Sequence, residues 1–173
     1  MRRASALLAA LALLLVTAAP ASANDDPHRS RLTAVPFDLP GGFGGICAFP
    51  VRVAFPVLNM YGTTSYLPDG TRVLTVTGKE FISATNLDTL KTITVNTFSP
   101  GTFMWPLDGK TMIWDGHGPG WFEAPNLAAD YGFPSNFVVV AGSAHVVQDL
   151  ATGDYISLSG HLNVLTDVCA ALS

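Results

Sequence analysis

From residue 46 onward, short apolar and β-branched runs alternate with turn residues, and this pattern predicts a succession of strands. The run over 155–168 is the clearest, because apolar residues such as Leu158 occupy even positions and polar residues such as Ser159 occupy odd positions. A period of two places alternate side chains on opposite faces of a strand. No helical period of apolar residues persists in this part of the chain. We therefore predict an all-β domain over 46–173.

Several segments carry the β-branched and aromatic residues typical of strands. They are 46–55, 63–67, 71–78, 80–86, 91–98, 102–105, 110–114, 136–148 and 155–168. Turn sequences such as Asp108-Gly109 separate them, since glycine supplies the positive φ of a tight turn. About eight or nine strands of this spacing fit a single antiparallel β-barrel or a two-sheet β-sandwich. We favour the barrel, because closure removes exposed strand edges.

The chain has two cysteines, Cys47 and Cys169, which lie near the two ends of the predicted domain. In an oxidising compartment such a pair is expected to form a disulfide. The bond would place the first and last strands side by side. Two buried free thiols are the alternative. A reactive thiol is not indicated, because the sequence around the cysteines lacks the basic groups that lower a thiol pKa.

Residues 1–23 have the three parts of a signal peptide: a basic start, an apolar stretch over 6–16, and small residues before the cleavage point. We expect cleavage after Ala23 and secretion to the extracellular space. The apolar stretch is shorter than the roughly 20 residues that span a bilayer. No later segment is long and apolar enough, so we expect no membrane span. Residues 24–45 are polar and then rich in Pro and Gly, which is typical of a flexible N-terminal arm.

Composition narrows the choice of partners. The formal net charge is −4, and only 13% of the residues are charged. This balance argues against nucleic acid or an anionic membrane as the main partner. The hydrophobic content of 49% indicates a folded domain rather than a disordered chain.

The connection over 115–135 is longer than the about 12–15 residues usual for a loop within a compact domain. It combines glycines with aromatic residues, so it could close over a barrel mouth and bind a small apolar or glycan-like ligand. We therefore predict ligand-binding roles for Trp121, Phe122, Tyr131 and His117. The alternative is that the aromatic side chains plug one end of the core.

The last two predicted strands would form a hairpin that brings two histidines to one face. His145 falls opposite Ser159 or the serine two residues before it. His161 falls opposite Ser143 or the alanine two residues before it. Histidines beside hydroxyls suit acid–base or nucleophilic catalysis, so His145, His161 and Ser159 are candidate catalytic residues. Any solvated sheet face carries the same residue types, and a non-catalytic face is the alternative.

Metal binding is weakly indicated. Asp115 and His117 lie two residues apart, and Glu123 and Asp130 follow, but no third ligand has diagnostic spacing. The chain also lacks the HExxH, CxxC, EF-hand, P-loop and GxSxG patterns. We expect no metal and no cofactor.

Four short motifs carry a resemblance to known sequences. They are C-x-F-P-V at 47–51, T-N-L-D-T at 85–89, S-P-G-T-F at 99–103 and G-x-L-x-x-x-x-D-V-C-A-A-L at 160–172. In these motifs the chain resembles small secreted all-β proteins of unknown function from high-GC Gram-positive bacteria. The resemblance implies the fold and the Cys47–Cys169 bridge, and it carries over no catalytic residue. The segment 115–135 is where the chain departs most from that group.

These observations favour a secreted, non-catalytic protein that binds a small apolar or glycan-like ligand or a surface partner. An extracellular enzyme is the first alternative, either a hydrolase or a barrel-type cyclase or isomerase. It would use His145 and His161, or Asp115 and His117, as acid–base groups. A structural protein of the cell envelope is the second alternative.

Overall fold

The computed structural model describes residues 29–42, 45–98 and 100–173. Its strands are β1 (Arg29–Arg31), β2 (Phe37–Leu39), β3 (Val51–Tyr66), β4 (Arg72–Asn86), β5 (Thr92–Asn96), β6 (Gly101–Trp105), β7 (Thr111–Glu123), β8 (Phe137–Asp149) and β9 (Tyr155–Asp167). Two short helices, α1 (Leu127–Tyr131) and α2 (Val168–Leu172), follow β7 and β9. The signal peptide predicted over 1–23 lies outside the described residues.

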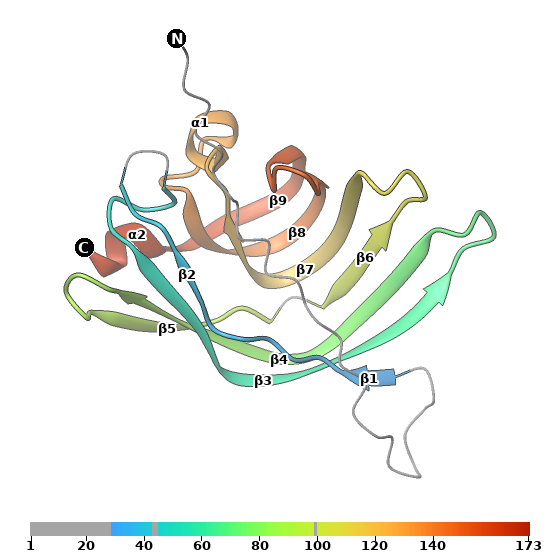
Figure 1. The fold of residues 1–173 in the computed structure, drawn as a ribbon, viewed down its shortest axis with the longest axis horizontal. Helices are drawn as coiled ribbons and strands as arrows, with labels where there is room; N and C mark the ends of the chain where they lie inside the picture. The colour runs from blue at the N-terminus through green and yellow to red at the C-terminus, as the bar shows by residue number, and fades with distance from the viewer. Residues whose placement is uncertain (1–28, 43–44, 99) are drawn as a thin grey trace.

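All the strands of the described chain belong to one antiparallel sheet. The sheet order is β1-β3-β4-β6-β7-β8-β9, with β2 also paired to β3 and β5 also paired to β4. The predicted all-β, antiparallel fold is therefore confirmed. Figure 1 shows that the sheet curves strongly, so that β3 and β4 form a lower layer beneath β6, β7, β8 and β9.

The predicted closure into a barrel is not confirmed. Over the described residues, the outer strands β1 and β9 do not pair with each other, so the sheet is not closed. At this end the chain turns directly from β9 into α2, which packs against β4, β5 and β8. The two facing layers are also compatible with the sandwich that the sequence left open.

Several predicted strands join into longer ones. The strands predicted over 71–78 and 80–86 form one strand, β4, which begins at residue 72 and ends at residue 86. The strand predicted over 63–67 is the end of β3, whose last residue is 66. Gly78 lies inside β4 with φ 134°, and a Cβ there would collide with the backbone of Asn59. Glycine allows the strand to bend at this close approach and to continue beyond it. In the sequence, the same glycine indicates a gap between two strands.

The prediction of one loop over 115–135 is wrong for its first part, 115–123. Residues up to Glu123 belong to β7, which pairs with β8 from Thr111 opposite Asp149 to Glu123 opposite Phe137. The alternating glycines hide the strand, because they remove the apolar and polar alternation that would reveal it. At Gly116 packing requires glycine, because a Cβ there would lie 2.5 Å from the Trp114 ring.

The segment 24–45, expected to be a flexible arm, contributes two strands to the sheet. β1 and β2 both pair with β3. Arg52 of β3 donates to the Asp38 carboxylate of β2, with 2.8 Å between Nε and Oδ1. Leu32 and Leu39 are buried. The described part of this segment therefore packs as part of the domain.

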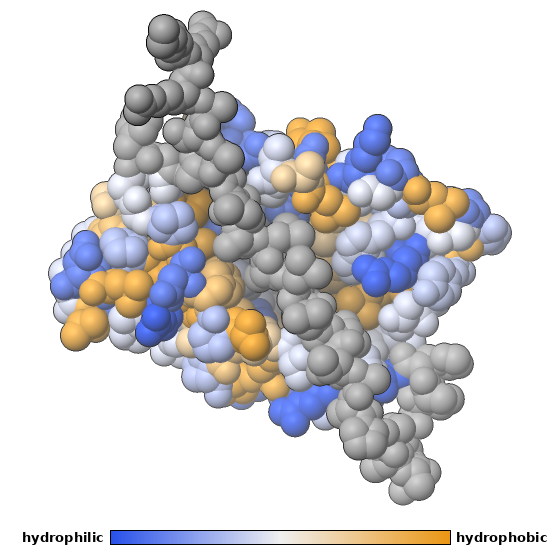
Figure 2. All heavy atoms as spheres, viewed as in Figure 1, coloured by the Kyte–Doolittle hydropathy of each residue, from blue (hydrophilic) through white to orange (hydrophobic). Residues whose placement is uncertain are grey.

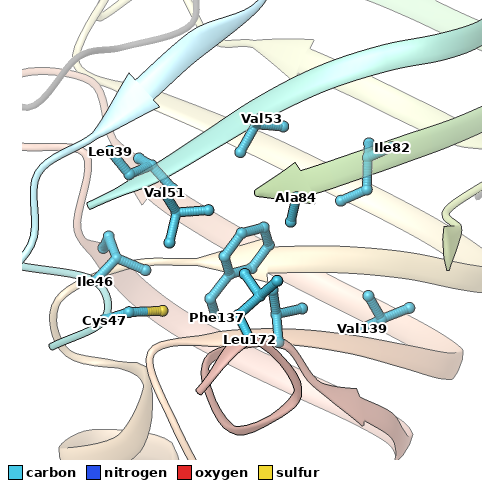
Figure 3. Close-up of a cluster of buried hydrophobic side chains, with 11 residues drawn as sticks. Leu39, Ile46, Cys47, Val51, Val53, Ile82, Ala84, Phe137, Val139 and Leu172 are labelled. Carbon is cyan, nitrogen blue, oxygen red and sulfur yellow. The ribbon is translucent and has the colours of Figure 1, made fainter. Parts of the chain in front are cut away.

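The first core cluster lies where β3 and β4 meet β8 and α2, and Figure 3 shows its side chains converging around Phe137. Its buried members are Leu39, Ile46, Cys47, Val51, Val53, Ile82, Ala84, Phe137, Val139, Val168 and Leu172. The predicted disulfide between Cys47 and Cys169 is confirmed, with a Cα–Cα distance of 5.5 Å. It joins the segment before β3 to α2, whereas β3 and β9 are not paired in the described chain.

Two smaller clusters complete the core. One joins β7, β8 and α1 through Phe122, Ala124, Leu127, Val138, Val140, Ala144 and Val146. The other joins Leu32 to Leu74 and Val76 of β4. Figure 2 shows that apolar residues on one face of the molecule form separate patches bordered by polar residues. Within the described ranges, no helix has the length and hydrophobicity needed to cross a membrane.

Candidate ligand-binding cavity

A cavity of about 470 Å³ lies between the layers of the sheet. Its size falls within the roughly 300–1,000 Å³ usual for small-molecule sites. The lining is mainly apolar and aromatic and comes from seven strands and the segments beside them: Leu32, Ala34, Val35, Phe37, Phe55, Leu58, Met60, Val76, Glu80, Thr97, Phe103, Met112, Trp114, Gly120, Trp121, Phe122, Val146, Gln148 and Tyr155. Val35 is 75% exposed, so the cavity reaches the surface near this residue.

A β-bulge in β3 builds one wall of the cavity. Before the bulge, Val53 pairs with Ala84, and after it, Leu58 pairs with Glu80. Directly paired residues share a face of the sheet, and the extra residue at the bulge keeps both Val53 and Leu58 on the inner face. Pro56 lies within this irregularity, where its missing N–H is tolerated.

The polar end of the cavity is formed by Glu80. The Thr97 hydroxyl donates to Glu80 Oε2 over 2.9 Å, and the Trp121 side chain lies beside the carboxyl group and lowers its pKa. Burial raises the pKa of Glu80, while both contacts act in the opposite direction. The Thr97 side chain is itself buried, so the carboxyl group is held in a fixed position.

Aromatic rings form the wall next to Glu80. The ring of Phe37 lies 6.3 Å from that of Trp121 and 6.4 Å from that of Phe55, measured between centroids. Such spacing is typical of packed aromatic pairs. Rigid rings of this kind present flat apolar surface to a ligand.

A second aromatic group lies around Trp114. Its ring is 6.0 Å from Phe103 and 5.3 Å from Phe122. The Trp114 Nε1 atom is buried without a hydrogen-bond partner among the described residues. It lies close to the backbone of Gly101 and Gly116, so its environment is the contact between β6 and β7.

The four predicted ligand-binding residues divide into two pairs. Trp121 and Phe122 line the cavity. Tyr131 belongs to α1, and its hydroxyl donates to the carbonyl oxygen of Tyr155 over 2.8 Å, so it braces the fold beside the cavity. His117 lies on the exposed face of β7 opposite Ser143, and it does not line the cavity.

Sequence reasoning missed Glu80, Thr97 and the contribution of the segment that contains Phe37. One signal for Glu80 was present: it has the same parity as Ile82 and Ala84, which are apolar residues on the core face of the same strand. The N-terminal segment offered no such signal, because its polar and Pro-rich composition is the same whether or not it pairs with a sheet.

The predicted hairpin register is confirmed. His145 lies opposite Ser159, and His161 lies opposite Ser143. Asp115 of β7 lies opposite His145 on the other side, and the two side chains are joined by a hydrogen bond of 2.6 Å between Oδ1 and Nδ1. Asp115, His145 and Ser159 therefore form a row across three strands.

This row lies away from the cavity. Next to the row, the lining residues Trp114 and Val146 occupy even positions, whereas Asp115 and His145 occupy odd positions on the opposite face. The His145 and Asp115 side chains are about half exposed. In the described part of the chain, no group of three or more His, Cys, Asp or Glu residues is arranged to hold a metal ion.

Glu123 at the end of β7 has an unusual environment. Burial raises its pKa to about 7. The neighbouring Tyr155 is also affected, since burial and the Glu123 charge raise the pKa of its phenol. Tyr155 packs edge-on against Phe122 at the cavity wall, with 5.8 Å between ring centroids.

Comparison of the chain with protein-family models, curated proteins and solved structures gives no match. The cavity and the exposed histidine face are therefore the features of the molecule that bear on its function.

Proposed function

We propose that this protein is a secreted, non-catalytic binding protein whose cavity holds a small, mainly apolar ligand. The observation that carries the proposal is the cavity of about 470 Å³, with its mainly aromatic and aliphatic lining and a few polar side chains, among them the Glu80 carboxyl group held by Thr97. Binding sites for small molecules combine these features: apolar walls supply affinity, and a few fixed polar groups supply orientation.

The energetics of such a site are favourable. Each buried CH₂ group contributes about 0.8 kcal/mol, so a ligand with about eight of them gains roughly 6 kcal/mol before the cost of association. An apolar ligand fits this lining better than a glycan, because a sugar would leave many hydroxyl groups without partners there.

The proposed location is extracellular, after removal of the signal peptide at Ala23. The Cys47–Cys169 disulfide supports it, since disulfides persist in oxidising compartments. We also propose that the curved sheet is a barrel-like scaffold of the kind expected for the small secreted all-β proteins that the chain resembles. N-terminal sequencing of the exported protein tests the cleavage site.

Titration with the neutral dye N-phenylnaphthylamine tests ligand binding, because its emission rises in apolar surroundings. The wild type should increase the emission saturably. Leu58→Trp should reduce dye affinity by about ten-fold or more, because the larger ring fills the cavity. Leu107→Trp is the matched control, since Leu107 is exposed and outside the lining, and it should bind like the wild type. No saturable binding by the wild type, or equal binding by both variants, would refute the proposal.

A hydrolase on the exposed face is the second candidate function. It is favoured by one observation, the Asp115–His145 hydrogen bond with Ser159 opposite His145. An aspartate that orients a histidine beside a serine is the arrangement of many acyl-transfer enzymes. Hydrolysis of p-nitrophenyl acetate tests it: this candidate requires turnover by the wild type that His145→Ala abolishes. The leading proposal predicts no turnover above the buffer rate.

A further inference from the structure

Glu80 is the one charged side chain among the described residues that line the cavity. The lining contains no Lys, Arg or His within the described ranges. Two arginines of β1 and β3 have other partners: Arg52 pairs with Asp38, and Arg31 donates to the carbonyl oxygen of Leu58. The carboxyl group therefore has no basic partner in this part of the chain.

The hydrogen bonds to the Glu80 carboxyl group leave some of its acceptor positions unused. A carboxylate offers about four acceptor positions. The Thr97 hydroxyl donates to Oε2 and fills one of these positions. A half-buried carboxylate without a positive partner is unfavourable, and a cation brought by a ligand would remove that penalty.

The surroundings of Glu80 also suit a cation. Trp121 lies beside Glu80 and packs against Phe37, which in turn packs against Phe55. All three rings line the cavity. The faces of aromatic rings attract ammonium groups, and aromatic cages with an acid are a recurrent solution for binding them.

We propose that the ligand of this cavity is a cationic amphiphile, with an apolar body and an ammonium group held between Glu80 and the rings of Phe37, Phe55 and Trp121. This inference rests on the proposed function, because the same cavity must accept the apolar body. A neutral alcohol can donate one hydrogen bond to Glu80 but does not neutralise it. A fatty acid places a second negative charge beside the first, which is unfavourable.

Three compounds of equal chain length test the inference: octylamine, octanol and octanoate, each used to displace N-phenylnaphthylamine at neutral pH. Wild-type protein should bind octylamine at least about ten-fold more tightly than octanol, with octanoate the weakest. Glu80→Gln keeps the size of the side chain and an oxygen that accepts from Thr97. It should remove the preference for octylamine and leave octanol binding unchanged. Glu123→Gln is the matched control, since Glu123 does not line the cavity, and it should keep the preference.

The outcomes separate the two proposals. If the dye does not bind the wild type, the proposed function fails and the inference fails with it. If the dye binds but the three compounds compete equally, the proposed function stands and the cationic ligand is overturned. If Glu80→Gln does not fold, the wild-type series decides alone, because equal affinities for octylamine and octanol would overturn the inference without any variant.

Discussion

Thr97 holds Glu80 through two hydrogen bonds: its hydroxyl donates to Oε2 over 2.9 Å, and its backbone N–H donates to the Glu80 carbonyl oxygen over 3.2 Å. Thr97 follows β5 and Glu80 lies within β4, so the pairing depends on the hairpin between them. The acid at the polar end of the cavity is therefore positioned by the fold before any ligand arrives.

Thr97→Val should lower the free energy of unfolding by about 1–3 kcal/mol, because it leaves the Glu80 carboxylate without one donor at nearly constant volume. Thr97→Ser keeps the hydroxyl and should restore most of the stability. Urea unfolding measures both. Thr94→Val is the control, because Thr94 is an exposed residue of β5, and it should change stability by less than about 0.5 kcal/mol. A Thr97→Val variant as stable as this control would contradict the account of Glu80.

Loss of the disulfide should be costly. The bond joins residues that are 122 positions apart, and closing so long a loop removes about 4–5 kcal/mol of unfolded-state entropy in the chain-entropy model. The double variant Cys47→Ala, Cys169→Ala should unfold at correspondingly lower urea concentration, and reduction of the wild type with dithiothreitol should give a similar loss. A loss below about 1 kcal/mol would show that the bond contributes little.

Glu123 should make stability depend on pH. Burial raises its pKa from 4.5 to about 7 in the folded protein. Between these values the folded state keeps a proton that the unfolded chain has released, so the contribution of Glu123 to stability falls as pH rises through this window. The full change is roughly 3 kcal/mol, and it is nearly complete by about pH 8, one unit above the raised pKa.

Glu123→Gln removes this titration. Compared with the wild type, the variant should gain roughly 3 kcal/mol in unfolding free energy between about pH 4.5 and pH 8. Urea unfolding at several pH values measures the difference between the two proteins, in which the other titrating groups cancel. If the two stability profiles run parallel across this range, the Glu123 carboxyl is not buried as described.

Gly142→Ala should be strongly destabilising. Gly142 lies within β8 with φ 135°, and a Cβ there would collide with the carbonyl oxygen of His161 on β9. We expect a loss of at least about 3 kcal/mol, because both the backbone strain and the backbone contact oppose the change. Gly132→Ala is the control: its φ is 70° but nothing lies within 4 Å, so it should cost only about 1–2 kcal/mol. Equal losses in thermal unfolding would contradict the close approach of β8 and β9.

The β8–β9 hairpin was the part of the fold that the sequence predicted best. The alternation around Leu158 and Ser159 fixes the inner and outer faces, and matching the apolar faces of two strands then fixes which residues pair. This is why the position of His145 opposite Ser159 could be predicted to within two residues. The cysteine pair was accessible for a different reason, because a chain with two cysteines allows one intramolecular disulfide.

β7 and the cavity were harder to predict from the sequence. Gly116, Gly118 and Gly120 remove the alternation of apolar and polar residues from β7. The close packing of Gly116 against Trp114 is visible only in the folded structure. Glu80 was missed because an acid is expected to face solvent. Its inward position follows from the β3–β4 register, from the donor Thr97 and from the neighbouring Trp121, none of which adjoins Glu80 in the sequence.

The most direct test of the account is methyl NMR of the folded protein during titration with octylamine. The account predicts saturable shifts of the methyl signals of Met60, Val76 and Val146, which line the cavity on β3, β4 and β8. The signals of the exposed Val164 and Leu165 on β9 should remain in place. Shifts confined to the β9 methyl groups, or no shift at saturating octylamine, would contradict binding within the cavity.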